Sequence, residues 1–267
     1  MSARQPALYL PHGGGPCFFM DWTMGPKDTW DRMAEWLRAI PATLPEPPKA
    51  LLVISAHWEE STFKVISAPA PPLLFDYYGF PPETYELTWP AAGEPALAAR
   101  IRQSLEQAGY PCGEEAQRGF DHGVFIPLKL AFPDANTPVV QLSLRKGLSP
   151  AEHVAIGRVL EPLRDDGVLI LGSGMSFHNM ARFNRRHALG ESERFDTWLE
   201  AACAEGSAGR EQALVAWESA PEARQCHPRE EHLLPLMVCA GAGGQEPGRV
   251  VFRDQVMGVV VSAIQFG

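Results

Sequence analysis

The chain has 267 residues, 45% of them hydrophobic and 21% charged, which is typical of a globular protein with a substantial core. This length favours one large α/β domain over residues 1–267. The formal net charge of −9 argues against nucleic acid and anionic membranes as partners, because both are polyanions.

The cysteines and the N-terminal residues indicate in which cellular compartment the protein is expected. The five cysteines are scattered and include no CxxC pair, which predicts reduced thiols rather than a disulfide framework or a zinc ribbon. Residues 1–10 lack the apolar core of a signal peptide, and no stretch approaches the roughly 20 apolar residues that span a bilayer. We therefore expect a cytoplasmic protein.

Short aliphatic runs alternate with amphipathic stretches along the chain, which predicts a mainly parallel sheet covered by helices. In chain order, the expected elements are a strand at 7–10, a helix at 27–40, strands at 50–55 and 63–67, helices at 95–108 and 123–132, a strand at 138–144, a helix at 150–164, a strand at 168–171, helices at 193–205 and 228–240, and strands at 250–253 and 258–265. The aromatic and proline-rich segment 75–92 is expected to be a long loop at the rim of a substrate site.

Three of the eight histidines follow predicted strands. His12, His57 and His178 each come within a few residues of the last apolar position of such a strand. Any one of them alone is more often an ordinary loop residue than a ligand. Ligands and catalytic groups of α/β proteins gather outside the carboxyl ends of parallel strands, however, so we expect the three imidazoles to converge on one site.

Two further histidines lie near the starts of predicted helices. His122 follows Asp121, which could both cap its helix and orient the imidazole. His232 lies one turn into its predicted helix, on the inward face with Leu236 and Cys239. An inward imidazole is usually a satisfied core histidine, and a metal ion is the alternative partner.

Two of the remaining three histidines are assigned no role in the site. His153 lies in a polar first turn and His187 in an arginine-rich loop, and both are predicted to face solvent. His227 is expected to be a structural residue at a helix start, close enough to the site to support it.

An imidazole cluster does not determine which metal is bound. Such clusters bind Zn, Cu, Fe or Ni, and three protein ligands with open positions serve both catalytic zinc and oxygen-activating iron. A zinc-dependent hydrolase is therefore one candidate function. The chain lacks the HExxH motif, however, and offers no carboxylate base at a recognised spacing.

Five ordered motifs surround these histidines and span essentially the whole chain. They are PHGGGP around His12, SAHW around His57, GFDHGVFIPL around His122, GSGMSFHN around His178 and HPREEHLLPL around His232. In these motifs, and in FDYYGFPPETYEL and PVVQLSL, the sequence resembles the class III extradiol ring-cleaving dioxygenases of the LigB type. Within that family it is most similar to the DOPA-4,5-dioxygenase-like branch.

The resemblance implies a fold and a set of roles. It implies a single-domain α/β fold with a central mixed sheet and a mononuclear non-haem metal, Fe(II) in function with Zn(II) in a purified form. His12, His57 and His232 would hold the metal. His178 would be the active-site acid/base, and His122 would contact substrate or oxygen.

The third ligand position departs from the best-known members of the family. Those members have a glutamate where this chain has His232, with Glu231 beside it, and the DOPA-dioxygenase-like branch shares the substitution. His178 would then be either the base or a fourth ligand in a zinc-loaded form.

The implied reaction opens the ring of a catechol, such as a DOPA-like substrate, with O2. The partners would be a small aromatic diol and O2, and the sequence indicates no oligomeric state. A Memo-type binding protein with a LigB-like fold and no dioxygenase activity is the alternative from a different class. Four aromatic side chains could pack against a bound aromatic ring: Trp58, Tyr77, Tyr78 and Phe80. Aromatic residues in such loops more often serve only in packing.

Overall fold

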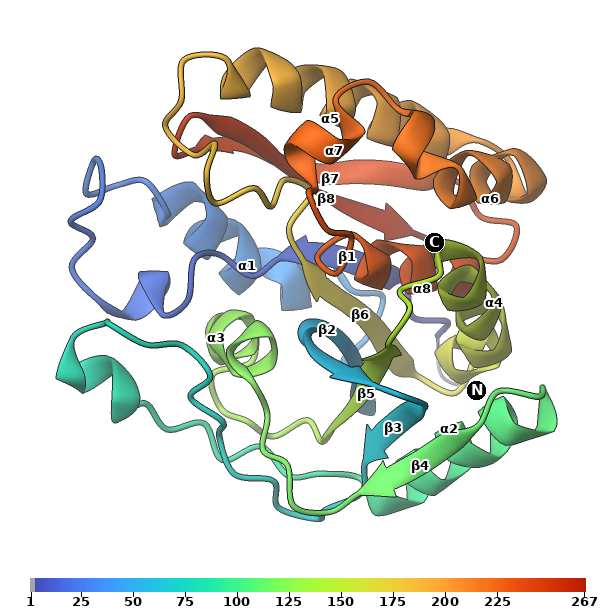
Figure 1. The fold of residues 1–267 in the computed structure, drawn as a ribbon. Coiled ribbons are helices and arrows are strands. Elements are labelled where there is room, and N and C mark those ends of the chain that lie inside the picture. Colours follow the sequence, from blue (N-terminus) through green and yellow to red (C-terminus); the bar gives the residue numbers. More distant parts are fainter. Residues whose placement is uncertain (1–2) are drawn as a thin grey trace.

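Strands from both halves of the chain form one sheet in the computed structural model, which describes residues 3–267 (Figure 1). The strands are β1 (Ala7–Pro11), β2 (Ala50–Glu60), β3 (Phe63–Ile66), β4 (Cys112–Glu115), β5 (Val139–Arg145), β6 (Val168–Gly174), β7 (Gly248–Val256) and β8 (Val259–Phe266). Their order across the sheet is β4-β3-β5-β2-β6-β1-β8-β7. The pairs within β5-β2-β6-β1 are parallel, whereas β8 joins β1 and β7 antiparallel. The predicted α/β fold with a central mixed, mainly parallel sheet is confirmed.

Helices cover both faces of this sheet. They are α1 (Asp31–Thr43), α2 (Pro95–Gln107), α3 (His122–Ala131), α4 (Pro150–Leu160), α5 (Ala188–Ala204), α6 (Ser207–Val215), α7 (Ala223–Cys226) and α8 (Leu234–Ala242), with 3-10 turns at Cys17–Phe19, Pro82–Tyr85, Glu161–Arg164 and Trp217–Ser219. Because both faces are covered, every residue of β1 and of β6 is buried.

Two neighbouring residues of β6 show the two layers directly. A Cβ atom on Gly172 would collide with Pro235 O of α8, which packs against α4. The next side chain points the other way, and Ser173 Oγ donates to Gly123 O of α3, which packs against α1. The carboxyl end of β6 is therefore enclosed between α3 and α8 (Figure 1).

The helix predicted at 228–240 begins later, at Leu234. Pro235 explains the difference, because proline lacks an N–H and its ring clashes with the carbonyl four residues earlier, so it belongs in the first helical turn. His232 therefore lies in the turn that leads into α8, and its predicted place on a helix face is wrong. Its side chain is nevertheless buried.

Other boundaries differ where the apolar pattern is weak. β2 continues to Glu60, beyond the predicted end at residue 55, and the sequence does not predict β4, α6 or α7. Within residues 3–267, no helix combines the length and the apolar character that crossing a bilayer requires.

Candidate metal centre

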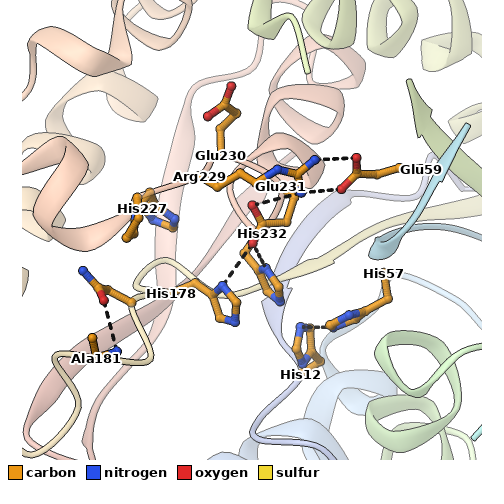
Figure 2. Close-up of polar contacts among 12 residues, drawn as sticks. His12, His57, Glu59, His178, Ala181, His227, Arg229, Glu230, Glu231 and His232 are labelled. Carbon is orange, nitrogen blue, oxygen red and sulfur yellow. Dashed lines mark hydrogen bonds and ion pairs between the residues drawn. The ribbon is translucent and has the colours of Figure 1, made fainter. Parts of the chain in front are cut away.

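Histidines from five separate parts of the chain meet at the carboxyl ends of β1, β2 and β6. β6 lies between the other two strands, so the three strand ends are neighbours. His12 directly follows β1, His57 lies near the end of β2, and His178 follows β6 after a short turn. His122 is the first residue of α3. His232 lies in the turn before α8, and Figure 2 shows it beside His12, His57 and His178.

His57 is turned into this site by an irregularity in β2. The register of β2 against β5 shifts between Ile54 and Glu59, where several residues of β2 oppose one residue of β5. Such a bulge bends the strand and redirects a side chain, and His57 lies within it. The His57 backbone N–H donates to Ser55 Oγ at 3.2 Å.

His12, His57 and His232 form a nearly equilateral triangle of rings. The ring centroids are 4.9 Å apart for His12 and His57, 5.3 Å for His12 and His232, and 4.9 Å for His57 and His232. The Nε2 atoms of His12 and His57 lie 3.2 Å apart. Three imidazoles at this spacing can direct nitrogen atoms to a common point.

Potential ligand atoms fall into two adjoining groups. Those of His12, His57 and His122 lie within 4.8 Å of one another, and so do those of His178, Glu231 and His232. The ligand set implied by the resemblance takes two residues from the first group and one from the second.

His12 is fixed with its Nε2 atom free of a proton. Its Nδ1 atom lies 2.9 Å from Gly13 O, which can only accept a hydrogen bond, so Nδ1 carries the proton. Gly13 adopts φ +85°, and a Cβ atom there would collide with Cys17 Sγ. Glycine therefore allows the chain to turn back immediately after His12.

His232 presents a buried nitrogen without a partner. Its Nδ1 atom lies 2.8 Å from the carboxylate oxygen Glu231 Oε1, which leaves the lone pair on Nε2. Among the described residues, His232 Nε2 has no hydrogen-bond partner. A buried polar atom without a partner is costly, and a cation held by neighbouring imidazoles would satisfy it. The residues present therefore fit a metal ion.

Burial keeps the three imidazoles of this triangle neutral. It lowers the pKa of His12, His57 and His232 well below the usual range, and repulsion from neighbouring imidazoles lowers it further. Neutral imidazole is the state that binds a metal, so the three side chains are ready as ligands at neutral pH.

His178 lies directly against His232. Their rings stack with centroids 3.3 Å apart and planes 17° apart. His178 Nδ1 donates at 3.1 Å to the same Glu231 oxygen that accepts from His232 (Figure 2). Burial alone would raise the pKa of Glu231, but the hydrogen bond from His178 and nearby positive charge lower it overall, so the carboxylate is ionised.

His122 is oriented by Asp76 and not by Asp121. Asp76 Oδ1 accepts from His122 Nδ1 at 2.8 Å. The ring of His122 lies 3.9 Å from that of His57. Asp121 instead accepts from Ser55 Oγ and makes no side-chain cap, so the predicted role of Asp121 is wrong. Asp76 was not singled out in the sequence, because it lies in the rim loop far from His122 along the chain.

The prediction that His153 faces solvent is also wrong. Its ring is fully buried beneath the end of β5, where Nδ1 donates to Ser149 O at 2.7 Å and Nε2 accepts from Arg145 N at 3.3 Å. Both ring nitrogens are satisfied, so His153 is a structural core histidine. His187 is exposed as predicted, and His227 is buried with Nε2 2.9 Å from Ser176 O.

The aromatic residues of the rim occupy different environments. Tyr77 is buried, with its ring 5.8 Å from that of His122, whereas Tyr78 is 89% exposed. Trp58 is buried beneath the guanidinium of Arg118. Of this group, Tyr77 is the one whose ring contacts a histidine of the site, and Phe80 packs against Tyr77.

The sequence matches a family model described as the catalytic LigB subunit of aromatic ring-opening dioxygenase over residues 6–264. A protein named Dioxygenase tasH from Hapsidospora irregularis is 35% identical, covering 98% of this chain and 85% of its own length. Proteins named 4,5-DOPA dioxygenase extradiol are similar as well. The one from Beta vulgaris is 37% identical over 80% of this chain and 81% of its own length, and the one from Escherichia coli is 33% identical over 100% and 96%.

A solved structure shares the fold. The crystal structure of an uncharacterized protein from Escherichia coli K12 superposes with a TM-score of 0.79 at 30% identity, covering 99% of this chain and 100% of that one.

Proposed function

This chain belongs to the LigB family of aromatic ring-opening dioxygenases, and we propose that it is an extradiol dioxygenase that opens the ring of a DOPA-like catechol with O2. The family expected from the five histidine motifs is thereby confirmed. Two of the three relatives described above carry the name 4,5-DOPA dioxygenase extradiol, and these names support the substrate class that we propose.

The metal of this proposal would be held by His12, His57 and His232. We favour Fe(II) in function, and the same imidazoles would accept Zn(II) in a purified form. When bound, the metal supplies a Lewis acid that makes the catechol hydroxyls more acidic and a redox centre for O2. The orphaned Nε2 atom of His232 and the close approach of His12 Nε2 to His57 Nε2 support this ligand set.

His178 would move the protons of the reaction. Its Nδ1 atom donates to Glu231, so the neutral ring has its lone pair on Nε2. At that atom His178 would take a proton from a catechol hydroxyl and return it during ring opening. Both atoms of O2 enter the ring-opened muconic semialdehyde, so the side chains need only transfer protons.

His122 lies beside His57 and His12, whereas His178 lies beside His232. From this position His122 would contact the substrate or O2. Its Nδ1 proton is committed to Asp76, and its ring lies against those of His57 and His12. The ring of Tyr77 packs edge-on against that of His122 and would help to exclude water from that side.

The observation that carries this proposal is the meeting of five imidazoles at one end of the sheet, three of them kept neutral by burial. A surface that only binds another protein has no need of buried, proton-free imidazole nitrogens. This argues against the Memo-type alternative. The zinc hydrolase alternative shares the ligands but needs a base close to a bound water, and the side chain that we place as base is a histidine rather than a carboxylate.

Oxygen uptake tests the proposal against both alternatives. Metal-free protein would be reconstituted anaerobically with Fe(II) and mixed with a panel of catechols that includes DOPA. We expect O2 consumption and a yellow ring-opened product with Fe(II), and neither of them with Zn(II). Ester or amide hydrolysis with Zn(II) in the absence of O2 uptake would favour the hydrolase, and inactivity with every substrate would favour the binding protein.

We also propose that residues 1–267 form one catalytic domain of a cytoplasmic enzyme. All five cysteines are free and buried, as expected for a protein in a reducing compartment.

A further inference from the structure

One carboxylate oxygen serves two imidazoles of the site. Glu231 Oε1 accepts from His232 Nδ1 at 2.8 Å and from His178 Nδ1 at 3.1 Å (Figure 2). The two rings that donate to it are stacked on each other, so the carboxylate lies at the shared edge of the stack. A change at Glu231 would therefore reach both rings at once.

These two hydrogen bonds determine where the ring protons lie. Glu231 Oε1 is the acceptor of both hydrogen bonds, so both Nδ1 atoms carry a proton, and each ring in its neutral form presents its lone pair at Nε2. Without this acceptor, each neutral ring could carry its proton on either nitrogen. For His232 the wrong tautomer would block metal binding, and for His178 it would remove the base.

Glu231 is itself held by the protein. Arg229 Nη1 lies 3.5 Å from Glu231 Oε2, and the same guanidinium donates to both carboxylate oxygens of Glu59 at 2.5 and 2.6 Å. Glu59 belongs to β2, two residues after His57. The bridge from Glu59 through Arg229 to Glu231 thus ties the turn that carries His232 to the strand that carries His57 (Figure 2).

The position of Glu231 also bears on the ligand that the family's best-known members use. Its Oε1 atom already accepts two hydrogen bonds, whereas Oε2, which accepts no hydrogen bond within residues 3–267, lies 3.5 Å from Arg229 Nη1. A rotation of the carboxylate into the coordination shell would break both hydrogen bonds. It would also leave the Nδ1 protons of the buried His232 and the half-buried His178 without an acceptor, which is unfavourable. A carboxylate behind a metal-binding imidazole is a common outer partner that fixes the tautomer and orientation of the ring.

We propose that Glu231 is a positioning residue that sets the tautomer of His232 as ligand and of His178 as base, and that it does not bind the metal. The role of His178 as base rests on the proposed function. The effect of Glu231 on the two rings and on metal affinity does not depend on that function. Glu231 would thus couple the metal site to the proton-transfer group through a single oxygen atom.

The test uses Glu231→Ala and the isosteric Glu231→Gln in the full chain, with Glu230→Gln as the matched control. The side chain of Glu230 pairs with Arg224 and points away from the histidines (Figure 2). Zn(II) affinity would be measured by competition with a chromophoric chelator. The histidine ring tautomers would be measured in the metal-free protein by 15N-detected NMR, which needs no enzymatic activity.

For Glu231→Ala we expect Zn(II) binding to weaken about 10- to 100-fold, as is typical when an outer partner of a ligand is lost, with one ion per chain still bound at saturation. The rings of His178 and His232 should become mixtures of tautomers. Glu231→Gln should lose less, because its amide oxygen still accepts, and Glu230→Gln should match the wild type. If these losses occur in a protein that consumes no O2 with any catechol, the proposed function fails while the positioning role stands.

Two results would overturn the inference. Unchanged Zn(II) affinity and unchanged ring tautomers in Glu231→Ala would mean that the carboxylate positions neither ring. Loss of the bound ion from Glu231→Gln with both ring tautomers preserved would mean that Glu231 is a ligand.

Discussion

His122 and Asp76 are joined by two hydrogen bonds to one oxygen atom. Asp76 Oδ1 accepts from His122 Nδ1 at 2.8 Å and from the His122 backbone N–H at 3.0 Å. Burial alone would raise the pKa of Asp76, but the hydrogen bonds from His122 lower it overall, so the carboxylate is ionised. The rim loop thus holds the first residue of α3 in place and fixes its ring against the ring of His57.

Removal of this carboxylate should slow turnover while the metal stays bound. In Asp76→Ala the His122 ring is free to rotate, and we expect kcat to fall about 10- to 100-fold, because a misplacement of about 1 Å can cost 10²-fold in rate. Metal content should equal that of the wild type. Asp134→Ala, at an exposed position after α3, is the control. An equal kcat in Asp76→Ala and the control would rule out an orienting role.

Much of the frame of the site is predictable from the sequence because apolar runs mark buried strands. β1 and β6 are short and fully buried; His12 directly follows β1, and His178 follows β6 after a short turn. Parallel neighbours end at the same edge, so the convergence of His12, His57 and His178 follows once the strands are recognised.

The supporting contacts were not predictable, because they depend on tertiary packing. The polar first turn of α4 suggested that His153 faces solvent, yet the backbone of Arg145 and Ser149 offers both ring nitrogens a partner inside the core. Asp76 and His122 are 46 positions apart, and no local pattern links them. The late start of α8 was the exception, since Pro235 could have indicated it.

Substitution of any of the three proposed metal ligands should greatly weaken metal binding. Since the loss of an outer partner already weakens binding about 10- to 100-fold, we expect each of His12→Ala, His57→Ala and His232→Ala to weaken Zn(II) binding more than about 100-fold. In the wild type, X-ray absorption should show one ion per chain with nitrogen neighbours at ~2.1 Å if zinc is bound.

Two control variants sharpen this ligand assignment. His187→Ala removes an exposed imidazole and should have no effect on Zn(II) binding. His122→Ala should also keep the ion. If His122→Ala loses the ion while His232→Ala keeps it, the ligands are instead the first group of His12, His57 and His122.

His153 should make stability depend on pH in weakly acidic solution. Burial lowers its pKa in the folded state to about 4, whereas an unfolded histidine titrates near ~6.5. As the pH falls from ~6.5 toward 4, protons bind the unfolded chain first, so the free energy of unfolding should decrease by about 3 kcal/mol from this group. Above ~6.5 the contribution is fully present. The effect should level off below the folded-state pKa.

Denaturant unfolding of His153→Gln and wild type at several pH values isolates this contribution. The other buried histidines titrate in both proteins, so their effects cancel in the comparison. We expect the stability of the wild type to fall more steeply than that of His153→Gln between pH ~6.5 and 4. The exposed His187→Gln should follow the wild type. Parallel curves for the wild type and His153→Gln would show that His153 titrates normally in the folded protein.

His178→Ala separates proton transfer from metal binding. If His178 is the acid/base, the variant should keep one metal ion and bind catechol while the single-turnover rate falls about 10²- to 10⁴-fold, the range typical of general acid–base catalysis. If His178 is a necessary fourth ligand, bound metal should fall together with the rate. We expect the metal to be retained, because His12, His57 and His232 already supply three imidazoles and His178 Nδ1 is committed to Glu231. Metal content and rate must come from one preparation. Full activity would refute both roles and return the binding protein to consideration.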